Sequence, residues 1–199
     1  MLKLYFAPFA CSMAVKLALL EAGLPHDQEK VSLRDHTTAS GADFYAINPR
    51  GAVPVLELEP GSVLTEVAVI LQYIADQNPA AALAPAVGTL ARYRLMETLN
   101  FIATELHKGF SPLWRKPPED QRSAVVATLN QRFAILDQRL AGHAFVLGDG
   151  FTVADAYLFV MLQWAEVLAV DVSAHANLAA YKKRLDARPT VAATLAAQA

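Results

Sequence analysis

The sequence predicts an α+β fold in which a small mixed sheet with helices is followed by an all-helical second half. Three observations predict this class. Up to residue 78, segments in which apolar and polar residues alternate, as in strands, are interspersed with segments that have the apolar spacing of helices. A stretch rich in proline and alanine then interrupts this pattern. Beyond that interruption, the apolar spacing is helical to the end of the chain. We therefore expect a first domain at 1–78, a linker at 79–88 and an all-helical domain at 89–199.

The first domain is predicted to start with a βαβ unit. Residues 2–6 alternate in polarity as a short strand does, and apolar periodicity favours a helix over 11–22. Glycine and proline at 23 and 25 end that helix. A second strand is expected at 27–32, and the polar stretch 34–41 is expected to be a loop.

A ββα unit is predicted next. A turn at 48–51 leads into a strand at 53–58, and Glu-Pro-Gly separates this strand from another at 62–65. The two strands form a hairpin. Apolar periodicity predicts a helix over 66–76, which completes the order βαβ, loop, ββα.

The second half is predicted to contain only helices, separated by clusters of proline and glycine. Alanine favours helix, and it supplies much of the apolar content. We expect helices at 89–114, 119–140, 153–169, 175–187 and 190–197.

Composition excludes several classes of protein. With 54% hydrophobic and 18% charged residues, the chain is not disordered, and 17 basic against 19 acidic residues give no basic surface for nucleic acid or an anionic membrane. The longest apolar stretch, around 156–165, falls short of the roughly 20 residues that a spanning helix needs. A single cysteine excludes an internal disulfide framework and a structural zinc site, and fits a reducing compartment. We expect a cytoplasmic protein that acts on small molecules or proteins.

The single cysteine, Cys11, stands where the first predicted strand turns into the first helix. Free backbone N–H groups and the positive end of the helix dipole favour a thiolate there, and such settings lower a thiol pKa from about 8.5 to roughly 3.5–7.5. The alternative is a buried, inert thiol. No cysteine follows three residues later, so any disulfide must form with an outside thiol.

Two further positions suit a ligand built from amino acids. Pro54 lies between a turn and a strand, which suggests a cis bond that would expose the backbone of Val53 to an extended peptide. An ordinary trans proline is the alternative. Thr65 and Glu66 precede a helix, where a carboxylate and free N–H groups can bind the ammonium and carboxylate of an amino acid together. Helix capping alone explains this pair equally well.

The predicted helix at 89–114 carries polar residues at intervals of three or four, which are Asn100, Thr104, His107 and Lys108. A stripe of this kind can line a cleft, where His107 would act as a hydrogen-bond donor or acid near a sulfur, and Lys108 would favour an anion. A solvated helix face is the alternative.

The start of the helix at 153–169 carries a capping box. Thr152 stands at the N-cap and Asp155 three residues later. We interpret this motif as structural rather than catalytic.

Taken together, five ordered motifs resemble the glutathione transferase family, and especially its bacterial beta class. They are Ala-Cys-Ser at 10–12, Asn-Pro-Arg-Gly-Ala-Val-Pro at 48–54, Leu-Thr-Glu at 64–66 with the apolar run at 68–76, the segment 104–113, and Phe-Thr-Val-Ala-Asp-Ala-Tyr at 151–157. The resemblance implies a thioredoxin-like N-terminal domain, a helical domain with a pocket for a hydrophobic electrophile, and a homodimer. It implies glutathione as co-substrate, with no metal and no other cofactor.

The resemblance also implies roles for individual residues. Cys11 would face the glutathione sulfur and could hold it in a mixed disulfide, with His107 nearby. Val53 would bond the tripeptide backbone beside a cis Pro54, and Glu66 would contact the γ-glutamyl end.

Further positions carry over from the family. The other glutathione-binding positions would be Ser12, His36, Val67, Asn100, Thr104 and Lys108, with Asn100 and Thr104 reaching the neighbouring subunit's ligand. Phe110 and Trp164 would line the electrophile pocket, although core packing explains them nearly as well. Val67 departs from the Ser of the wider family and the Gly of many beta-like members, and His36 departs from their frequent Lys.

Three functions remain open at this point. The first is conjugation of reduced glutathione to hydrophobic electrophiles, as in detoxification. The second is glutathione-dependent thiol-disulfide exchange or peroxide reduction through Cys11, and the third is a non-catalytic binding protein on the same fold.

Overall fold

The computed structural model describes residues 1–197 and divides the chain into two units. The first unit contains Met1–Leu83 and the segment that begins at Pro189, and the second contains Ala84–Arg188. We describe each unit by itself.

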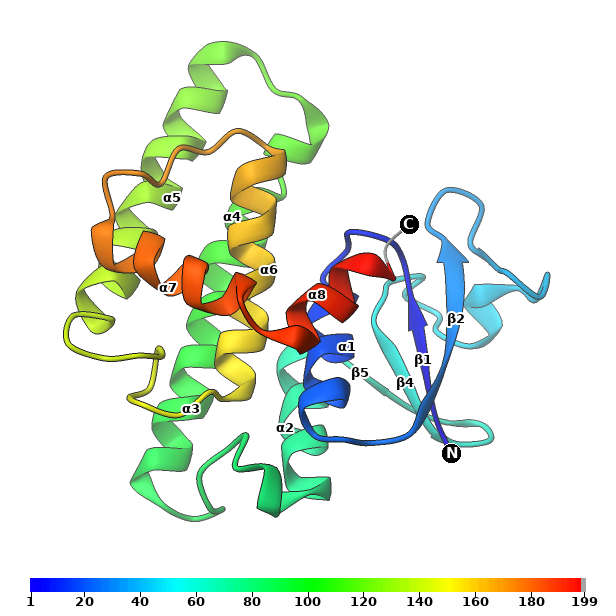
Figure 1. Ribbon diagram of the computed structural model, residues 1–199. Coiled ribbons are helices and arrows are strands. Elements are labelled where there is room, and N and C mark those ends of the chain that lie inside the picture. Colours follow the sequence, from blue (N-terminus) through cyan, green and yellow to red (C-terminus); the bar gives the residue numbers. More distant parts are fainter. Residues whose placement is uncertain (198–199) are drawn as a thin grey trace. The chain divides into compact units, whose positions relative to one another are not determined.

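A five-stranded mixed sheet forms the first unit (Figure 1). Its strands are β1 (Leu2–Phe6), β2 (His26–Ser32), β3 (Thr37–Thr38), β4 (Val55–Glu59) and β5 (Ser62–Thr65), in the spatial order β3-β2-β1-β4-β5. β1 and β2 run parallel, as a βαβ unit requires, and the other neighbours are antiparallel. This is the expected thioredoxin-like arrangement. The two-residue β3 falls inside the stretch expected to be a loop, because its pairing with β2 is too short to give an alternating pattern.

Helices α1 (Ser12–Glu21) and α2 (Val67–Gln77) pack against each other on one side of the sheet (Figure 1). A short 3-10 helix, η1 (Phe44–Ala46), belongs to the segment on the opposite face, where Phe44 packs with Tyr5 and other buried residues of the strands. The core of this unit therefore lies on both faces of the sheet.

The last helix, α8 (Pro189–Ala196), corrects the expected domain boundaries, because it belongs to the first unit and not to the helical domain. α8 packs against α1 and its Val191 is completely buried. The hydroxyl of Thr190 donates a hydrogen bond to the Glu21 carboxylate. Helical periodicity indicated this helix correctly but gives no information about which neighbour it covers.

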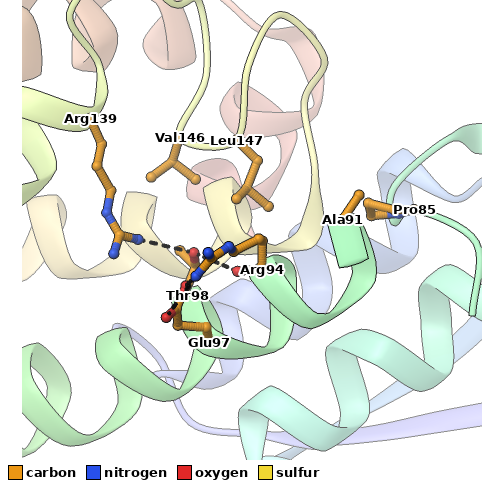
Figure 2. A pocket seen from close by; sticks show the side chains of 8 residues that line it. All are labelled: Pro85, Ala91, Arg94, Glu97, Thr98, Arg139, Val146 and Leu147. Atoms are coloured by element: carbon orange, nitrogen blue, oxygen red, sulfur yellow. Dashed lines mark hydrogen bonds and ion pairs between the residues drawn. The ribbon is translucent and has the colours of Figure 1, made fainter. Parts of the chain in front are cut away.

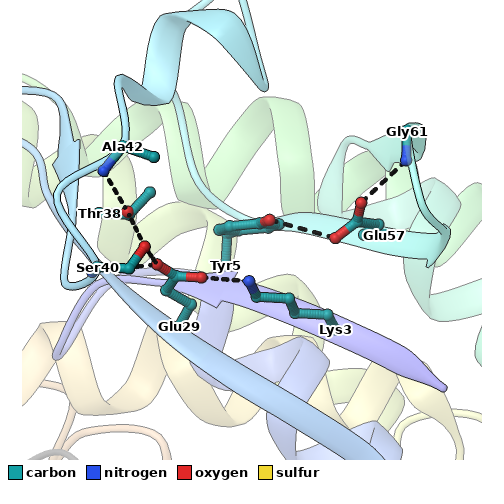
Figure 3. A network of polar contacts seen from close by, with 8 residues as sticks. All are labelled: Lys3, Tyr5, Glu29, Thr38, Ser40, Ala42, Glu57 and Gly61. Atoms are coloured by element: carbon teal, nitrogen blue, oxygen red, sulfur yellow. Dashed lines mark hydrogen bonds and ion pairs between the residues drawn. The ribbon is translucent and has the colours of Figure 1, made fainter.

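A polar network lies on the sheet where β1, β2 and β4 meet (Figure 3). Glu29 pairs with Lys3 and accepts from the Ser40 hydroxyl, while the Tyr5 hydroxyl donates to Glu57 over 3.2 Å. Hydrogen bonds from Lys3 and Ser40 lower the pKa of the Glu29 carboxyl from 4.5 to about 2. These side chains tie the central strands to the segment that follows β2.

The second unit is helical, as expected, but its first helix is not the single element predicted at 89–114. Regular α-helix α3 (Leu90–Phe101) continues as a π-helical stretch, η3 (Ile102–His107), then as the short α4 (Lys108–Phe110) and the 3-10 turn η4 (Leu113–Arg115). Gly109 faces Leu129 so closely that an added Cβ would lie 2.9 Å from a side-chain carbon of Leu129. Tertiary packing of this kind, invisible to local periodicity, accompanies the change of helix type.

The remaining helices are α5 (Glu119–Arg139), α6 (Val153–Val167) and α7 (Ala176–Asp186). α6 is buried over almost its whole length and forms the centre of this unit (Figure 1). The predicted capping box is confirmed, since Asp155 accepts from the backbone N–H and the hydroxyl of Thr152 at 2.8 and 2.9 Å. Within residues 1–197, no helix combines the length and the apolar character needed to cross a membrane.

Candidate functional site

Cys11 is the N-cap residue of α1, as the sequence predicted, and its side chain is 7% exposed. Its Sγ lies 3.4 Å from the backbone carbonyl of Val53, to which the thiol donates. The first amides of a helix have no intrahelical acceptor and carry the positive end of the helix dipole. The sulfur is therefore close both to a helix N-terminus and to the loop before β4.

The peptide bond between Val53 and Pro54 is cis, which confirms that prediction. Val53 lies just before β4 and is half-buried, and it packs on the core of Tyr5, Phe44 and neighbouring residues. The carbonyl of Val53 already accepts from Cys11, so the backbone predicted to meet a peptide is in direct contact with the thiol.

Ser12 has a structural contact that the sequence did not indicate. Its hydroxyl is buried, donates to the Ala7 carbonyl over 3.2 Å and accepts from the Ala7 N–H over 3.3 Å. These two bonds join the turn after β1 to the first turn of α1. Ser12 therefore fixes the position from which Cys11 extends.

The corner between β5 and α2 holds a charged pair. Nη1 of Arg50 donates to Oε1 of Glu66 over 2.7 Å, and Nη2 donates to the Thr65 hydroxyl. Both charged side chains are open to solvent, with 58% of Arg50 and 64% of Glu66 exposed. Arg50 lies in the Asn-Pro-Arg-Gly motif at 48–51, but nothing in its spacing indicates that it reaches Glu66, so the sequence does not predict it as a site residue.

The backbone of Glu66 is unusual, with φ of 71° and ψ of 119° directly before α2. A residue with a side chain adopts positive φ at a cost of about 1–3 kcal/mol, and such residues concentrate at binding sites. The carbonyl of Glu66 accepts from Val69 and Ile70 and so begins the helix. Val67 stands at the first helical position with only 5% of its side chain exposed, so its side chain belongs to the core and only its amide can serve a ligand.

His36 lies on a tight turn of the same unit. It has φ of 51°, its ring is 4.4 Å from that of Tyr45, and its Nδ1 is a buried atom without a hydrogen-bond partner among the described residues. Gly51 lies against both rings, because a Cβ at this position would come within 2.9 Å of each of them. A side chain other than hydrogen at position 51 would displace His36.

In the helical unit, His107 is the last residue of the π-helical stretch. Its Nδ1 lies 2.6 Å from the hydroxyl of Tyr157, a buried residue of α6, and its ring lies 4.9 Å from that of Trp164. If Tyr157 donates to Nδ1, the neutral ring carries its proton on Nε2, where it can donate to an anion. Tyr157 lies in the motif at 151–157, but the sequence does not indicate that it contacts His107.

The predicted polar stripe on this helix is only partly correct. Asn100, Thr104 and Lys108 are exposed, and the Thr104 hydroxyl donates to the Asn100 carbonyl. His107 is half-buried against α6 and is not part of that exposed face. A π-helix has more residues per turn than an α-helix, which shifts the angular positions after residue 102.

The two residues expected in the electrophile pocket belong to a cluster of aromatic rings. Phe110 is fully buried, and its ring lies 5.9 Å from Trp164 and 6.2 Å from Phe133. Trp164 is 7% exposed and also contacts the half-exposed Trp114 at 5.5 Å. Core packing thus accounts for Phe110, whereas the rings of Trp164 and Trp114 extend from the core to the surface.

Two surface pockets of the helical unit lie beside charged residues. One, of about 530 Å³, is lined by Lys108, Ser111, Arg115 and neighbouring residues. The other, of about 460 Å³, lies between α3 and the loop at 146–147, and Figure 2 shows Arg139 donating to Thr98 in its wall, over 3.2 Å. No predicted site residue lines this second pocket.

Comparison with known proteins shows the family. Residues 10–77 match the family model described as the N-terminal domain of glutathione S-transferase, and residues 101–189 match the C-terminal domain of the same family. The chain belongs to the glutathione S-transferase family. The first match contains Cys11, Val53 and Glu66, and the second contains His107 and Trp164.

Relatives of this glutathione S-transferase extend over the whole chain. It is 39% identical to glutathione S-transferase GstA of Escherichia coli O157:H7 over 198 residues, which are 99% of this chain and 98% of that protein. A sphingomonad glutathione S-transferase, solved in complex with glutathione, is 44% identical with a TM-score of 0.92, covering 98% of each chain. The bacterial beta-class enzyme of Sphingomonas chungbukensis is also 44% identical, with a TM-score of 0.93 and the same coverage. The predicted resemblance to the beta class is therefore confirmed.

Proposed function

We propose that this glutathione S-transferase binds reduced glutathione on its first unit and joins the glutathione sulfur to hydrophobic electrophiles. The observation that carries the proposal is the arrangement around Cys11, whose thiol lies at the N-terminus of α1 and 3.4 Å from the carbonyl before the cis Pro54. The solved complex of the sphingomonad relative with glutathione supports the choice of ligand. Glutathione is the co-substrate, and the reaction requires no metal and no further cofactor.

The cysteinyl and γ-glutamyl parts of glutathione have counterparts among the described residues. The backbone of Val53 pairs with the cysteinyl part of the tripeptide, as an added strand pairs with a sheet edge. The carboxylate of Glu66 binds the γ-glutamyl ammonium, and the first amides of α2, at Val67 and Ala68, donate to the γ-glutamyl carboxylate. His36 takes the position from which many beta-like members contact the ligand through Lys.

The chemistry requires a thiolate. The N-terminus of α1 stabilises negative charge on the glutathione sulfur. The family resemblance adds His107, whose ring is held by Tyr157, as a hydrogen-bond donor to the thiolate. The thiolate attacks the electrophilic carbon, a carbon–sulfur bond forms, and the leaving group departs with its electron pair. The rings of Trp114 and Trp164 bind the apolar part of the electrophile.

Three further parts of the proposal concern the assembly, which comes from the family resemblance, the location and the role. The protein is a homodimer, in which Asn100 and Thr104 reach the ligand of the neighbouring subunit and Lys108 favours its negative charge. It acts in the cytoplasm, and its role is detoxification.

Steady-state conjugation of 1-chloro-2,4-dinitrobenzene at varied glutathione concentration tests the proposal. We expect turnover that saturates with glutathione, and a higher KM for glutathione in Glu66→Gln. Glu59→Gln is the matched control, because Glu59 is an exposed carboxylate at the end of β4 with no part in the site. A rate equal to the uncatalysed reaction would contradict the proposal and favour a non-catalytic binding protein.

A second candidate function is thiol-disulfide exchange, which the contact of Cys11 with the loop before Pro54 favours. The Cys11 thiolate attacks one sulfur of glutathione disulfide, a mixed disulfide forms, and one glutathione leaves as its thiolate. Intact-mass analysis after exposure to glutathione disulfide tests this step. We expect one glutathione per chain that a reductant removes, and none on Cys11→Ala; an unmodified wild-type protein would contradict it.

A further inference from the structure

We propose that a positively charged pocket of the helical unit binds an acidic group on the electrophile, so that the protein favours aromatic electrophiles that carry a carboxylate. The inference rests on the proposed function and names a substrate class for the same reaction. This cationic pocket, of about 530 Å³, lies between the segment of α4 and η4 and the start of α5. It is lined by Lys108, Ser111, Pro112, Arg115, Pro117 and Gln121.

The polar side chains of the cationic pocket can all donate hydrogen bonds, and none of them is acidic. Lys108 and Arg115 are positively charged, the Ser111 hydroxyl has one donor and the Gln121 amide has two. Within residues 1–197, the side chains of Lys108 and Arg115 form no ion pair and no hydrogen bond. Their donors are therefore available to a ligand that only accepts, such as a carboxylate.

The nearest acidic residues along the chain do not neutralise this pocket. Glu119 and Asp120 in the first turn of α5 are exposed and lie outside the pocket lining, and the Glu119 carboxylate accepts from the Ser123 hydroxyl over 3.2 Å. Glu105, on the turn before the pocket, pairs with Arg132 at 2.8 Å. Two like charges around one pocket repel each other, and a bound anion compensates both.

The cationic pocket is next to the aromatic rings to which the proposed function assigns the electrophile. The rings of His107 and Trp114 lie 4.9 and 5.5 Å from that of Trp164. Each of the first two residues is followed directly by a cation of the pocket, Lys108 or Arg115. Successive residues of a helix are turned by about 100–120° around its axis. The segment therefore presents its rings and its charges on neighbouring sides.

An aromatic ring that bears a carboxylate matches both sides together. The ring packs on the indoles of Trp114 and Trp164, and the carboxylate accepts from Arg115, whose planar guanidinium can donate two parallel bonds. The reaction is the one already proposed. The glutathione thiolate attacks the ring carbon that bears chlorine, a carbon–sulfur bond forms, and chloride leaves with its electron pair. The carboxylate keeps its charge throughout and contributes only to binding.

Steady-state conjugation of two matched electrophiles tests the inference. 4-Chloro-3,5-dinitrobenzoate carries a carboxylate opposite the carbon that loses chloride, and 4-chloro-3,5-dinitrobenzamide carries a neutral group of similar size there. The kcat/KM of each is divided by the rate constant of its uncatalysed reaction with glutathione, which corrects for intrinsic reactivity. We expect the wild-type protein to favour the benzoate about fivefold, an effect that an exposed ion pair can supply.

Arg115→Gln removes one charge of the cationic pocket and should reduce this preference to less than about twofold. Arg115 is the position to change, because Lys108 already has a place in the proposed glutathione site. Lys183→Gln is the matched control, since it removes an exposed positive charge of α7 outside the pocket lining, and it should keep the full preference. Sodium chloride at about 1 M, where the screening length falls to about 3 Å, should reduce the wild-type preference as Arg115→Gln does.

A preference in Arg115→Gln equal to that of the wild type overturns the inference. An equal loss of preference in Lys183→Gln also overturns it, because the effect would then come from the net charge of the protein. If neither electrophile reacts faster than without the protein, the proposed function fails as well. Conjugation of the benzamide with no preference for the benzoate overturns the inference alone.

Discussion

His107 illustrates how a single residue in this protein depends on a partner far away in the sequence. Its imidazole is fixed by the Tyr157 hydroxyl 2.6 Å away and lies edge-on to Trp164. The tyrosine determines which ring nitrogen carries the proton, and hence whether the other nitrogen donates or accepts. Sequence patterns indicated His107 but not this partner, because a contact between positions 50 residues apart leaves no local signal.

We expect His107→Ala to lower the kcat/KM of conjugation by about 10- to 100-fold, since a lost hydrogen bond to a charged group is worth about 1.5–3 kcal/mol. Tyr157→Phe removes only the hydroxyl that orients the imidazole, so we expect a smaller loss. Steady-state kinetics of both variants, with thermal melting as a control for folding, measures this. Unchanged kcat/KM in His107→Ala would show that the residue takes no part in the reaction.

At the scale of elements, helix and strand positions followed from periodicity, but the irregular segments did not. Alternation and apolar spacing correctly predicted β1, α1 and α2 to within one residue at each end. The π-helical stretch and the packing of α8 depend on tertiary contacts, for which residues 102–107 and 189–196 carry no local sequence signal. The same contrast between local and tertiary features holds in the candidate site. The helix N-termini at the site could be predicted from the sequence, whereas the contact of Arg50 with Glu66 could not.

Glu29 couples the stability of the sheet to pH. The pKa of its carboxyl falls from 4.5 to about 2 in the folded protein, mainly because Lys3 donates a hydrogen bond to it and secondly because Ser40 does. A carboxyl whose pKa is lower in the folded protein than in the unfolded chain stabilises the folded state at pH values above the unfolded-state pKa. This stabilisation is lost as the pH falls through the folded-state pKa. We therefore expect the stability advantage of wild type over Glu29→Gln to be full at about pH 6 and to shrink steadily between about pH 4.5 and 2.

Urea unfolding of wild type and Glu29→Gln across this range measures the difference in unfolding free energy. Glu59→Gln serves as the control, because Glu59 is exposed at the end of its strand. A difference between wild type and Glu29→Gln that is independent of pH would contradict the assignment.

The start of α6 depends on a single buried carboxylate. Asp155 is fully buried and accepts from the amide of Val146, the hydroxyl of Tyr181, and both the amide and the hydroxyl of Thr152. Asn at this position would replace one acceptor oxygen by an N–H₂ group, which cannot accept a hydrogen bond from these donors. We therefore expect Asp155→Asn to lower the free energy of unfolding by about 1–3 kcal/mol for each donor left without an acceptor. Denaturant unfolding beside the exposed control Asp149→Asn tests this, and equal stability of the two variants would be the contrary result.

At the scale of the whole molecule, the exposed apolar face of α3 supports the proposed homodimer. Leu90, Tyr93 and Met96 are 72%, 59% and 41% exposed, and they recur every three residues along the helix. We expect light scattering at micromolar concentration to report a dimer, and Tyr93→Asp to shift it towards monomer because a charge would enter an apolar contact. Val167→Asp, at an apolar position exposed to the same degree as Tyr93, should leave the dimer intact. A monomeric wild-type protein would contradict the proposal.

The central claim is that the protein binds glutathione and holds its sulfur as a thiolate. The most direct measurement is the pH titration of thiolate ultraviolet absorbance for glutathione bound to Cys11→Ala, in which the only cysteine of the chain is absent. We predict that bound glutathione titrates at about pH 7 or below, against about 8.5 for a free thiol. A bound sulfur that titrates as the free thiol does would contradict the account.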